Sequence, residues 1–370
     1  MGLQITRVLV RSAKIPTDMD GYRAAVLADL HDCTLGDNNR ILRDALYRED
    51  PAALLIAGDM ITESHTGVHM SNAYRLLCEL SDSFDIYYAM GNHELRWKNK
   101  EKARPAFEKY KESLINNGII FLENSSVCLC RKGCGGEDKC VKYSEGTDGI
   151  GNESRSADDS REACMGGYGS STIREDSKDC EGSKVWEGSK VSEDGKDCEG
   201  SKVWEGSKVS KDSKDCEDSK SNKDNKGMGI RLIGLDLPPI YYRKKKITGL
   251  DALAVEGMVG AADRERFNVL LAHSPQYFEA YSEWGADLTL SGHFHGGIIR
   301  LPLLGGVISP YLRLFPKYDK GIYRSGRGEG RMVLAAGLGT HTFPRINNPA
   351  ELVLLTFKHG ESKATEVICI

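Results

Sequence analysis

Apolar runs of strand length alternate along the chain with segments in which apolar residues recur every three or four positions. NRILRDALYRED and SNAYRLLCELSDS have the spacing of amphipathic helices, and RPAFEKYKESLINNG is a third helix that closes at Gly118. Apolar strands that alternate with helices predict an α/β fold whose sheet faces are covered by helices. The predicted strands are residues 22–31, 52–59, 84–94 and 229–236 and the segments FNVLLAHSP, ADLTLSGHFHGG, GRMVLAAGLGTH and AELVLLTFKHG.

One long segment breaks this pattern. Residues 131–228 contain no leucine and no phenylalanine, and they include two full copies of an 18-residue repeat, KDCEGSKVWEGSKVSEDG and KDCEGSKVWEGSKVSKDS. Such a composition buries too little apolar surface to offset the entropy lost on ordering. We therefore predict that residues 131–228 are a disordered, low-complexity insert within a single catalytic domain formed by residues 1–130 and 229–370.

The insert holds six of the 11 cysteines, so metal binding is the alternative interpretation of this segment. Cys180, Cys198 and Cys216 are 18 residues apart, whereas zinc sites are built from close cysteine pairs.

The start of the chain, MGLQITRVLVRSAKIP, has neither the apolar core nor the cleavage site of a signal peptide. Reduced thiols and a cytoplasmic location are therefore expected.

Charge and hydropathy argue against two classes of function. The formal net charge is −4, and the residues outside the insert carry 32 basic and 31 acidic side chains, a net charge of +1. A nuclease would favour a strongly basic groove, so no nucleic-acid partner is expected. No apolar run reaches the roughly 18–20 residues of a membrane span.

Five of the predicted strands end in side chains that are common metal ligands. The motifs DLH, GD, GNHE, AH and GHFH stand at these ends, and most of them contain a glycine. Ligand sites in α/β sheets lie beyond the carboxyl ends of the strands, so the five ends are expected to converge. Oxygen and nitrogen ligands of this kind suit divalent transition metals. The set is Asp29, His31, Asp59, Asn92, His93, His273, His293 and His295.

The size of this set predicts two metal ions. One ion takes three or four protein ligands plus water, so seven ligands suit two ions that share a carboxylate. Two ions about 3.5–4 Å apart can stabilise the attacking and leaving oxygens of a phosphoryl transfer. Water held between them would supply hydroxide near neutral pH. Mn, Fe, Zn and Ni all suit these ligands.

The series D-x-H, G-D, G-N-H-E, a later H and G-H-x-H resembles the calcineurin-like metallophosphoesterase superfamily, from about residue 5 to residue 357 outside the insert. AHSPQYF, GHFHGGIIRLP and GLGTHTFPRINNPAELVLL resemble a bacterial branch of membrane-associated phosphodiesterases, some of which hydrolyse the pyrophosphate bond of UDP-diacylglucosamine. The resemblance implies a four-layer α/β/β/α sandwich. It assigns Asp29, His31 and His295 to the first metal, Asn92, His273 and His293 to the second, Asp59 to both, and His93 to the phosphate.

The resulting hypothesis is a phosphohydrolase that cleaves a phosphodiester or pyrophosphate bond through a metal-bridging hydroxide. A phosphomonoesterase and a non-catalytic metal-binding scaffold are the alternatives, although no ligand has been lost as the scaffold would require. The expected substrate is a phosphorylated small molecule or a lipid-linked molecule. The basic run at 241–246 and the apolar segment 301–315 leave peripheral membrane contact open beside solvated and packed loops.

Four further residues are candidates for the same region. His341 follows a strand and would approach the site, and Arg345 would bind a phosphate through two N–H groups or form a structural salt bridge. His65 and His69 have the i,i+4 spacing of a metal-binding pair at a helix start, although a solvated position is the simpler interpretation.

Overall fold

The computed structural model describes residues 2–64, 67–131, 229–242, 249–297, 299–301, 305–308, 314–340, 345–362 and 364–370. Apart from Arg131, the predicted insert lies outside these residues, as do His65 and His341. None of the helices in the described ranges is both long enough and apolar enough to cross a membrane.

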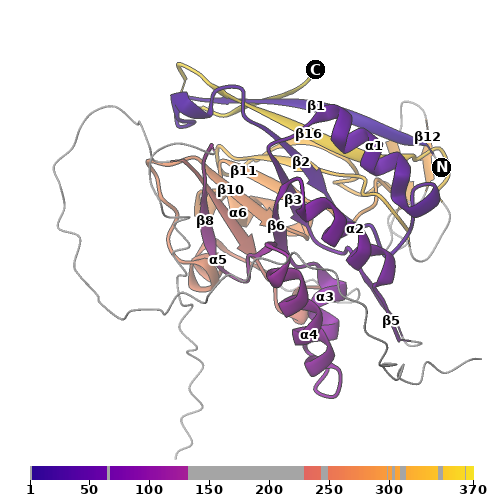
Figure 1. Cartoon of the computed structure of the whole chain (residues 1–370). Helices are drawn as coiled ribbons and strands as arrows, with labels where there is room; N and C mark the ends of the chain where they lie inside the picture. Colours follow the sequence, from indigo (N-terminus) through magenta and orange to yellow (C-terminus); the bar gives the residue numbers. More distant parts are fainter. Residues whose placement is uncertain are drawn as a thin grey trace, which may run out of the picture. The chain divides into compact units, whose positions relative to one another are not determined.

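Two large sheets run through the molecule (Figure 1). The seven-stranded sheet has the order β17 (Glu366–Cys369), β1 (Leu3–Ser12), β16 (Ala350–His359), β2 (Arg23–Leu27), β3 (Ala53–Ala57), β6 (Asp85–Ala89) and β7 (Ile120–Phe121). The six-stranded sheet has the order β14 (Gly321–Arg324), β15 (Arg331–Leu334), β11 (Leu288–Ser291), β10 (Asn268–Ala272), β9 (Ile230–Leu235) and β8 (Ser126–Leu129).

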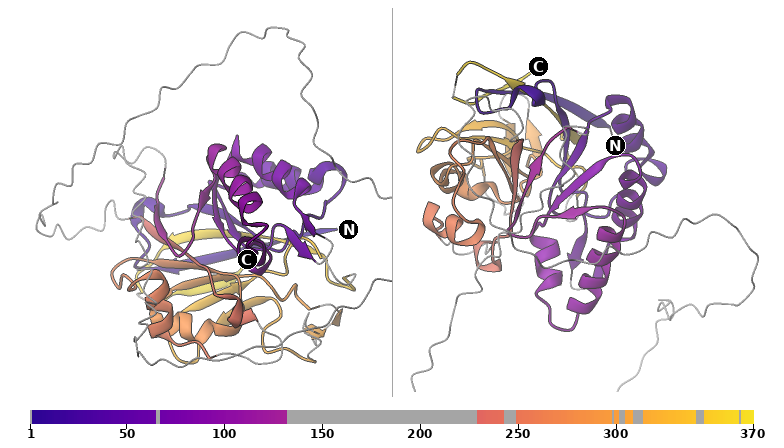
Figure 2. Two further views of the ribbon diagram at one scale, coloured as in Figure 1. Left: turned by 90° about the horizontal axis from the view of Figure 1, so that it is seen from below. Right: turned by 60° about the vertical axis from the view of Figure 1, so that its left-hand side comes forward.

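Helices cover the outer face of each sheet, as the two views of Figure 2 show. The helices α1 (Arg40–Glu49), α2 (Ser71–Ser81) and α4 (Arg104–Asn116) form one apolar cluster with the seven-stranded sheet. The helices α5 (Ala252–Val259) and α6 (Phe278–Trp284) form another with the six-stranded sheet, and a third cluster fills the space between the sheets. The α/β/β/α layering is therefore confirmed.

The strand β3 shows why the central strands read as continuous apolar runs. All five of its residues are buried, with Leu54 and Ile56 in the helix-facing cluster and Leu55 in the cluster between the sheets. Alternate side chains point to opposite faces, so a strand covered on both sides needs apolar residues at every position.

The parallel strands place their carboxyl ends along a common edge of each sheet. In the seven-stranded sheet β2, β3 and β6 are parallel neighbours, and in the six-stranded sheet β9, β10, β11 and β15 are parallel neighbours. The edge strand β8 pairs antiparallel with β9, with Leu129 opposite Ile230. The chain therefore leaves the sheet for the insert and returns to it at adjacent positions.

Two local predictions differ from the structure. The strand predicted to run to residue 94 ends at Ala89, because GNHE begins the helix α3 (Asn92–Lys98). The helix-face alternative for His65 and His69 is wrong, because His69 lies in the hairpin of β4 (Thr62–Ser64) and β5 (Gly67–His69). His69 is exposed there, in agreement with the simpler interpretation of a solvated position. The helix α2 begins later, where Asp32 Oδ1 accepts hydrogen bonds from the N–H groups of Asn72 and Ala73.

Candidate metal centre

Each of the predicted ligands stands within a few residues of a strand's carboxyl end. Asp29 follows β2, Asp59 follows β3, His273 follows β10, and the histidines of GHFH follow β11. Five of these side chains sit on residues with left-handed backbone geometry: Asp29, His31, Asp59, His293 and His295, with φ from 52° to 74°. Left-handed geometry costs about 1–3 kcal/mol at a non-glycine residue and persists mainly at functional sites.

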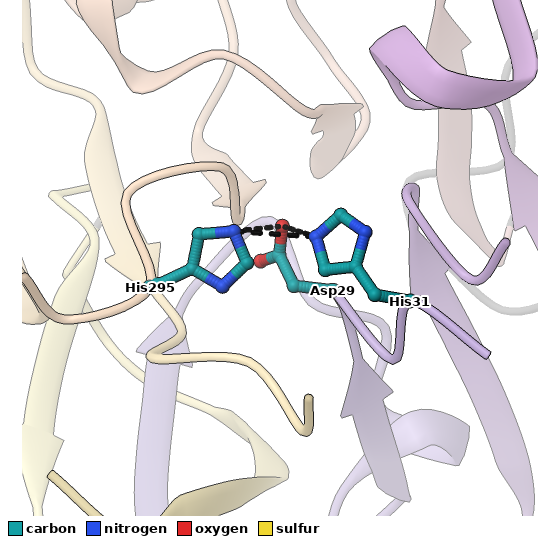
Figure 3. A group of neighbouring side chains, drawn as sticks. All are labelled: Asp29, His31 and His295. Atoms are coloured by element: carbon teal, nitrogen blue, oxygen red, sulfur yellow. Dashed lines mark hydrogen bonds and ion pairs between the residues drawn. The ribbon is translucent and has the colours of Figure 1, made fainter. Parts of the chain in front are cut away.

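The first group of ligand atoms surrounds Asp29 (Figure 3). Its Oδ1 lies 3.7 Å from Nε2 of His31 and 3.6 Å from Nε2 of His295. The two imidazole nitrogens are 3.2 Å apart. The main chain also holds the Asp29 carboxylate, because both of its oxygens accept from the N–H of His293, at 2.9 and 3.1 Å.

Asp59 lies between this group and the remaining histidines. Its Oδ2 is 3.0 Å from Nε2 of His273, 3.9 Å from Nε2 of His31 and 4.0 Å from Nε2 of His93. Of the three candidate ligand groups found among the described residues, Asp59 belongs to two, one with His31 and His93 and one with His273 and His293. Asp59 therefore faces two sets of candidate ligands.

The second group contains Asn92, His273 and His293. One end of the Asn92 amide lies 2.7 Å from Nδ1 of His293. Nδ1 of His273 lies 2.6 Å from the carbonyl oxygen of Ala57, an interaction that fixes the ring with Nε2 toward the carboxylates. Hydrogen bonds of this kind orient metal-binding histidines and set their tautomer.

Charge in the centre also suits cations. Burial lowers the pKa of His293 to about 3, so its neutral ring is available as a ligand. Burial acts in the same direction on His273, but the Asp59 and Asp29 carboxylates outweigh it and raise the pKa of His273 to about 9. Burial disfavours an ionised Asp29, yet the surrounding imidazoles hold the pKa of this carboxyl well below its usual range. Two buried, ionised carboxylates need compensating positive charge, and divalent ions fit that need.

Close packing around the carboxylates explains two of the motif glycines. A Cβ atom on Gly91 would lie 2.2 Å from Oδ1 of Asp59, and one on Gly292 would lie 2.4 Å from Oδ2 of Asp29. Any larger residue would displace a carboxylate of the centre. The glycines of GNHE and GHFH are therefore required by the position of the acids.

His93 is held by the hairpin of β4 and β5. Its Nδ1 lies 2.9 Å from the main-chain nitrogen of Glu63 and 3.1 Å from the carbonyl oxygen of the same residue. Its main-chain N–H donates to Oδ1 of Asp59 at 2.8 Å. The main chain of Glu63 therefore orients the His93 ring, whereas the Glu94 carboxylate contacts different groups.

Glu94 instead anchors the loop that carries Asp59. Its Oε2 accepts from the N–H groups of Asp59 and Gly91, both at 3.0 Å. Its Oε1 accepts from the N–H groups of Met60 and Ile61 and from the Tyr88 hydroxyl. Sequence reasoning missed this role, and the only signal for it was an acidic residue directly after the site motif.

Arg345 and His341 are the further candidates predicted for this region. Arg345 donates to the main-chain carbonyls of Ala336, Gly339 and Pro349, so its observed contacts are structural but are not the predicted salt bridge. Its binding of substrate stays a prediction, and His341 lies outside the described residues. Tyr242 was not predicted, but its ring lies edge-on to His293 with centroids 5.5 Å apart.

Comparison with known proteins agrees with this geometry. Residues 22–176 match the family model of the calcineurin-like phosphoesterases. Over this stretch the chain is similar to the calcineurin-like phosphoesterases. The matched stretch contains the predicted site residues from Asp29 to His93, whereas His273, His293 and His295 lie beyond it and are brought to the centre by the fold.

Two curated relatives are similar to part of the chain. An uncharacterized metallophosphoesterase of Bacillus subtilis (strain 168), YkuE, is 32% identical over 122 residues, which are 31% of this chain and 41% of that protein. An uncharacterized metallophosphoesterase of Aquifex aeolicus (strain VF5) is 34% identical over 97 residues, which are 26% of this chain and 34% of that protein. The similarity therefore spans less than half of either relative. No solved structure matches the chain.

Proposed function

We propose that this protein is a metal-dependent phosphohydrolase that holds two divalent ions and cleaves a phosphodiester or pyrophosphate bond. The observation that carries the proposal is the position of Asp59, whose Oδ2 faces His31, His93 and His273 within 4.0 Å. In this assignment Asp59 is shared by both ions. Asp29, His31 and His295 hold one, and Asn92, His273 and His293 hold the other.

Two divalent ions would neutralise charge on a phosphoryl group and lower the pKa of water held between them. The side chains around them have separate tasks. Asp29 and Asp59 supply the buried negative charge that retains the ions, and the fixed histidine rings set where they lie. Nδ1 of His93 contacts the main chain of Glu63, and its Nε2 lies 4.0 Å from Oδ2 of Asp59, so His93 is the group placed to protonate a leaving oxygen.

The hairpin supports this role of His93 in either protonation state. When Nδ1 carries a proton it can donate to the carbonyl oxygen of Glu63, and when it is bare it can accept from the N–H of the same residue. The ring can therefore give up a proton from Nε2 without losing its anchor. A proton donor that stays in place after transfer needs no rearrangement before the next cycle.

The proposed substrate class is based on the groups that the centre would present to a phosphate. Two ions, one proton donor and a buried set of ligands suit the phosphate of a small molecule or of a lipid-linked compound. We propose these as the substrates.

Metal analysis and a substrate panel test the proposal together. Purified protein loaded with Mn²⁺ should retain two equivalents and hydrolyse bis(p-nitrophenyl) phosphate or a nucleoside-diphosphate derivative, and a chelator should abolish the hydrolysis. Turnover limited to monoesters such as p-nitrophenyl phosphate would refute the substrate class. Two bound ions without hydrolysis of any member of the panel would instead favour a binding scaffold.

A further inference from the structure

A cluster of two cations and one carboxylate lies beside the centre and has no part in the ligand groups. Oε2 of Glu63 is 3.1 Å from Nε of Arg96, and Oε1 of Glu63 pairs with the ammonium group of Lys100. The Glu63 side chain is 7% exposed, whereas that of Arg96 is 46% exposed. One negative and two positive charges leave the cluster with a net charge of +1, next to a site that takes phosphate.

Arg96 also reaches the ligand Asn92, four residues earlier on α3. Its Nη2 lies 3.2 Å from the end of the Asn92 amide that points away from His293. The opposite end of the same amide lies 2.7 Å from Nδ1 of His293. The amide therefore stands between a metal-binding ring on one side and a guanidinium group on the other.

The two orientations of this amide require different surroundings. With its nitrogen toward His293, the amide donates to the ring, and its oxygen accepts from Arg96 and from the main-chain N–H of His93, both at 3.2 Å. With its oxygen toward His293, as a metal ligand would be, and with Nδ1 of His293 bare, two acceptors face each other on that side. On the other side the amide N–H then faces the N–H groups of Arg96, and two donors face each other. A cation satisfies the first pair, and an anion satisfies the second.

We propose that Arg96, together with the amide N–H of Asn92, binds a non-bridging oxygen of the phosphate that is cleaved. The inference rests on the proposed function and adds a substrate-binding residue to it. Arg96 is suited to the task because its guanidinium has five N–H groups and the contact with Glu63 engages Nε, so donors remain for a phosphate. Lys100 forms its own ion pair with Glu63, so the buried carboxylate keeps a partner when an anion binds Arg96.

Glu63 is a positioning residue in this arrangement. Its carboxylate holds Arg96, and its main chain holds His93. The hairpin of β4 and β5 therefore fixes the anion-binding group and the proton donor through one residue. Such a link keeps both at a constant distance from the phosphate, which matters because small misplacements of catalytic groups are costly.

Binding and kinetics of four variants test the proposal. Calorimetry would measure the Kd of inorganic phosphate and of inorganic pyrophosphate on Mn²⁺-loaded protein, and the KM and kcat for bis(p-nitrophenyl) phosphate would be measured in parallel. Arg96→Ala should weaken the binding of both anions and raise KM by about 10- to 100-fold, with two metal equivalents retained. Arg96→Lys should lose less, since it keeps the charge but not the planar fork.

Two more variants separate this role from a general effect of charge. Lys100→Ala removes the other cation on Glu63 and should weaken phosphate binding much less than Arg96→Ala does, because Arg96 still pairs with the carboxylate. Asn92→Asp keeps a ligand oxygen but replaces the amide N–H by an oxygen that pairs with Arg96. It should retain both metals and weaken phosphate binding as much as Arg96→Ala does.

The outcomes are distinct. Unchanged phosphate and pyrophosphate binding in Arg96→Ala, with a wild type that hydrolyses the diester, would overturn the inference and leave the proposed function intact. A loss confined to pyrophosphate would overturn the assignment to the cleaved phosphate. A wild type that binds phosphate through Arg96 but hydrolyses nothing would leave the anion site standing and refute the proposed function.

Discussion

Replacing Glu94 by glutamine should destabilise the fold strongly, although the two side chains have nearly the same shape. The Glu94 carboxylate is fully buried and accepts hydrogen bonds from four main-chain N–H groups and the Tyr88 hydroxyl. A glutamine has one acceptor oxygen and one NH₂ group. In the variant, the NH₂ group must therefore face some of the donors that the carboxylate now satisfies.

The size of the effect follows from counting those donors. An NH₂ group at the Oε2 position meets the N–H groups of Asp59 and Gly91, and one at the Oε1 position meets those of Met60 and Ile61. Either orientation leaves two buried main-chain donors without an acceptor. At about 1–3 kcal/mol for each unsatisfied group, the free energy of unfolding should fall by about 2–6 kcal/mol. The corresponding fall in Tm is about 4–20 °C.

Denaturant unfolding with a chelator in every sample would measure this loss without a contribution from bound metal. Glu79→Gln is the matched control, because the side chain of Glu79 is 40% exposed and pairs with Arg43 on the surface of the helical layer. It should change stability by less than about 1 kcal/mol. If Glu94→Gln also stays within about 1 kcal/mol of the wild type, the carboxylate does not hold the Asp59 loop as described.

Four further outcomes are expected. Asp59→Asn should lower bound metal below two equivalents and reduce hydrolysis by orders of magnitude, and full metal occupancy with normal turnover would rule out a shared ligand. His93→Ala should keep both metals but lower kcat by roughly 10²–10⁴, less so for a p-nitrophenol leaving group, and equal losses for all leaving groups would contradict proton donation. Burial and Glu123 raise the pKa of Asp236 to about 8. Since the unfolded-state pKa is about 3.9, the folded protein keeps an extra proton between these values, and unfolding free energy should fall as pH rises from about 4 to about 8 in the wild type but less in Asp236→Asn. Excision of residues 131–228 with a short Gly/Ser linker should leave a folded, metal-binding domain because Leu129 and Ile230 are strand partners, and an insoluble product would show that the segment packs on the core.

Local pattern was enough to predict the strands that carry the centre. The run at β3 is apolar at every position because both of its faces are covered, and GD follows where the strand ends. The same reasoning applies to β2 and β10, whose ends carry Asp29 and His273. Strand length, burial on two faces and a polar terminus are all properties of neighbouring residues, so the sequence alone contains them. The order of the motifs then indicated the family and its layered fold.

Contacts between distant segments were decided only by the tertiary structure. Asp59 and Glu94 are 35 residues apart in sequence, and they meet because β3 and β6 are parallel neighbours whose ends lie side by side. The contact between Asp59 and Glu94 accompanies the start of α3 at Asn92, inside the predicted strand. The contact of His93 with the main chain of Glu63 is likewise made between distant segments. The sequence determined which side chains could bind metal, since that depends on residue type. The hydrogen bonds that hold these side chains, and the neighbours that shift their pKa values, depend on which main-chain groups the fold brings near them. No local sequence pattern encodes that arrangement.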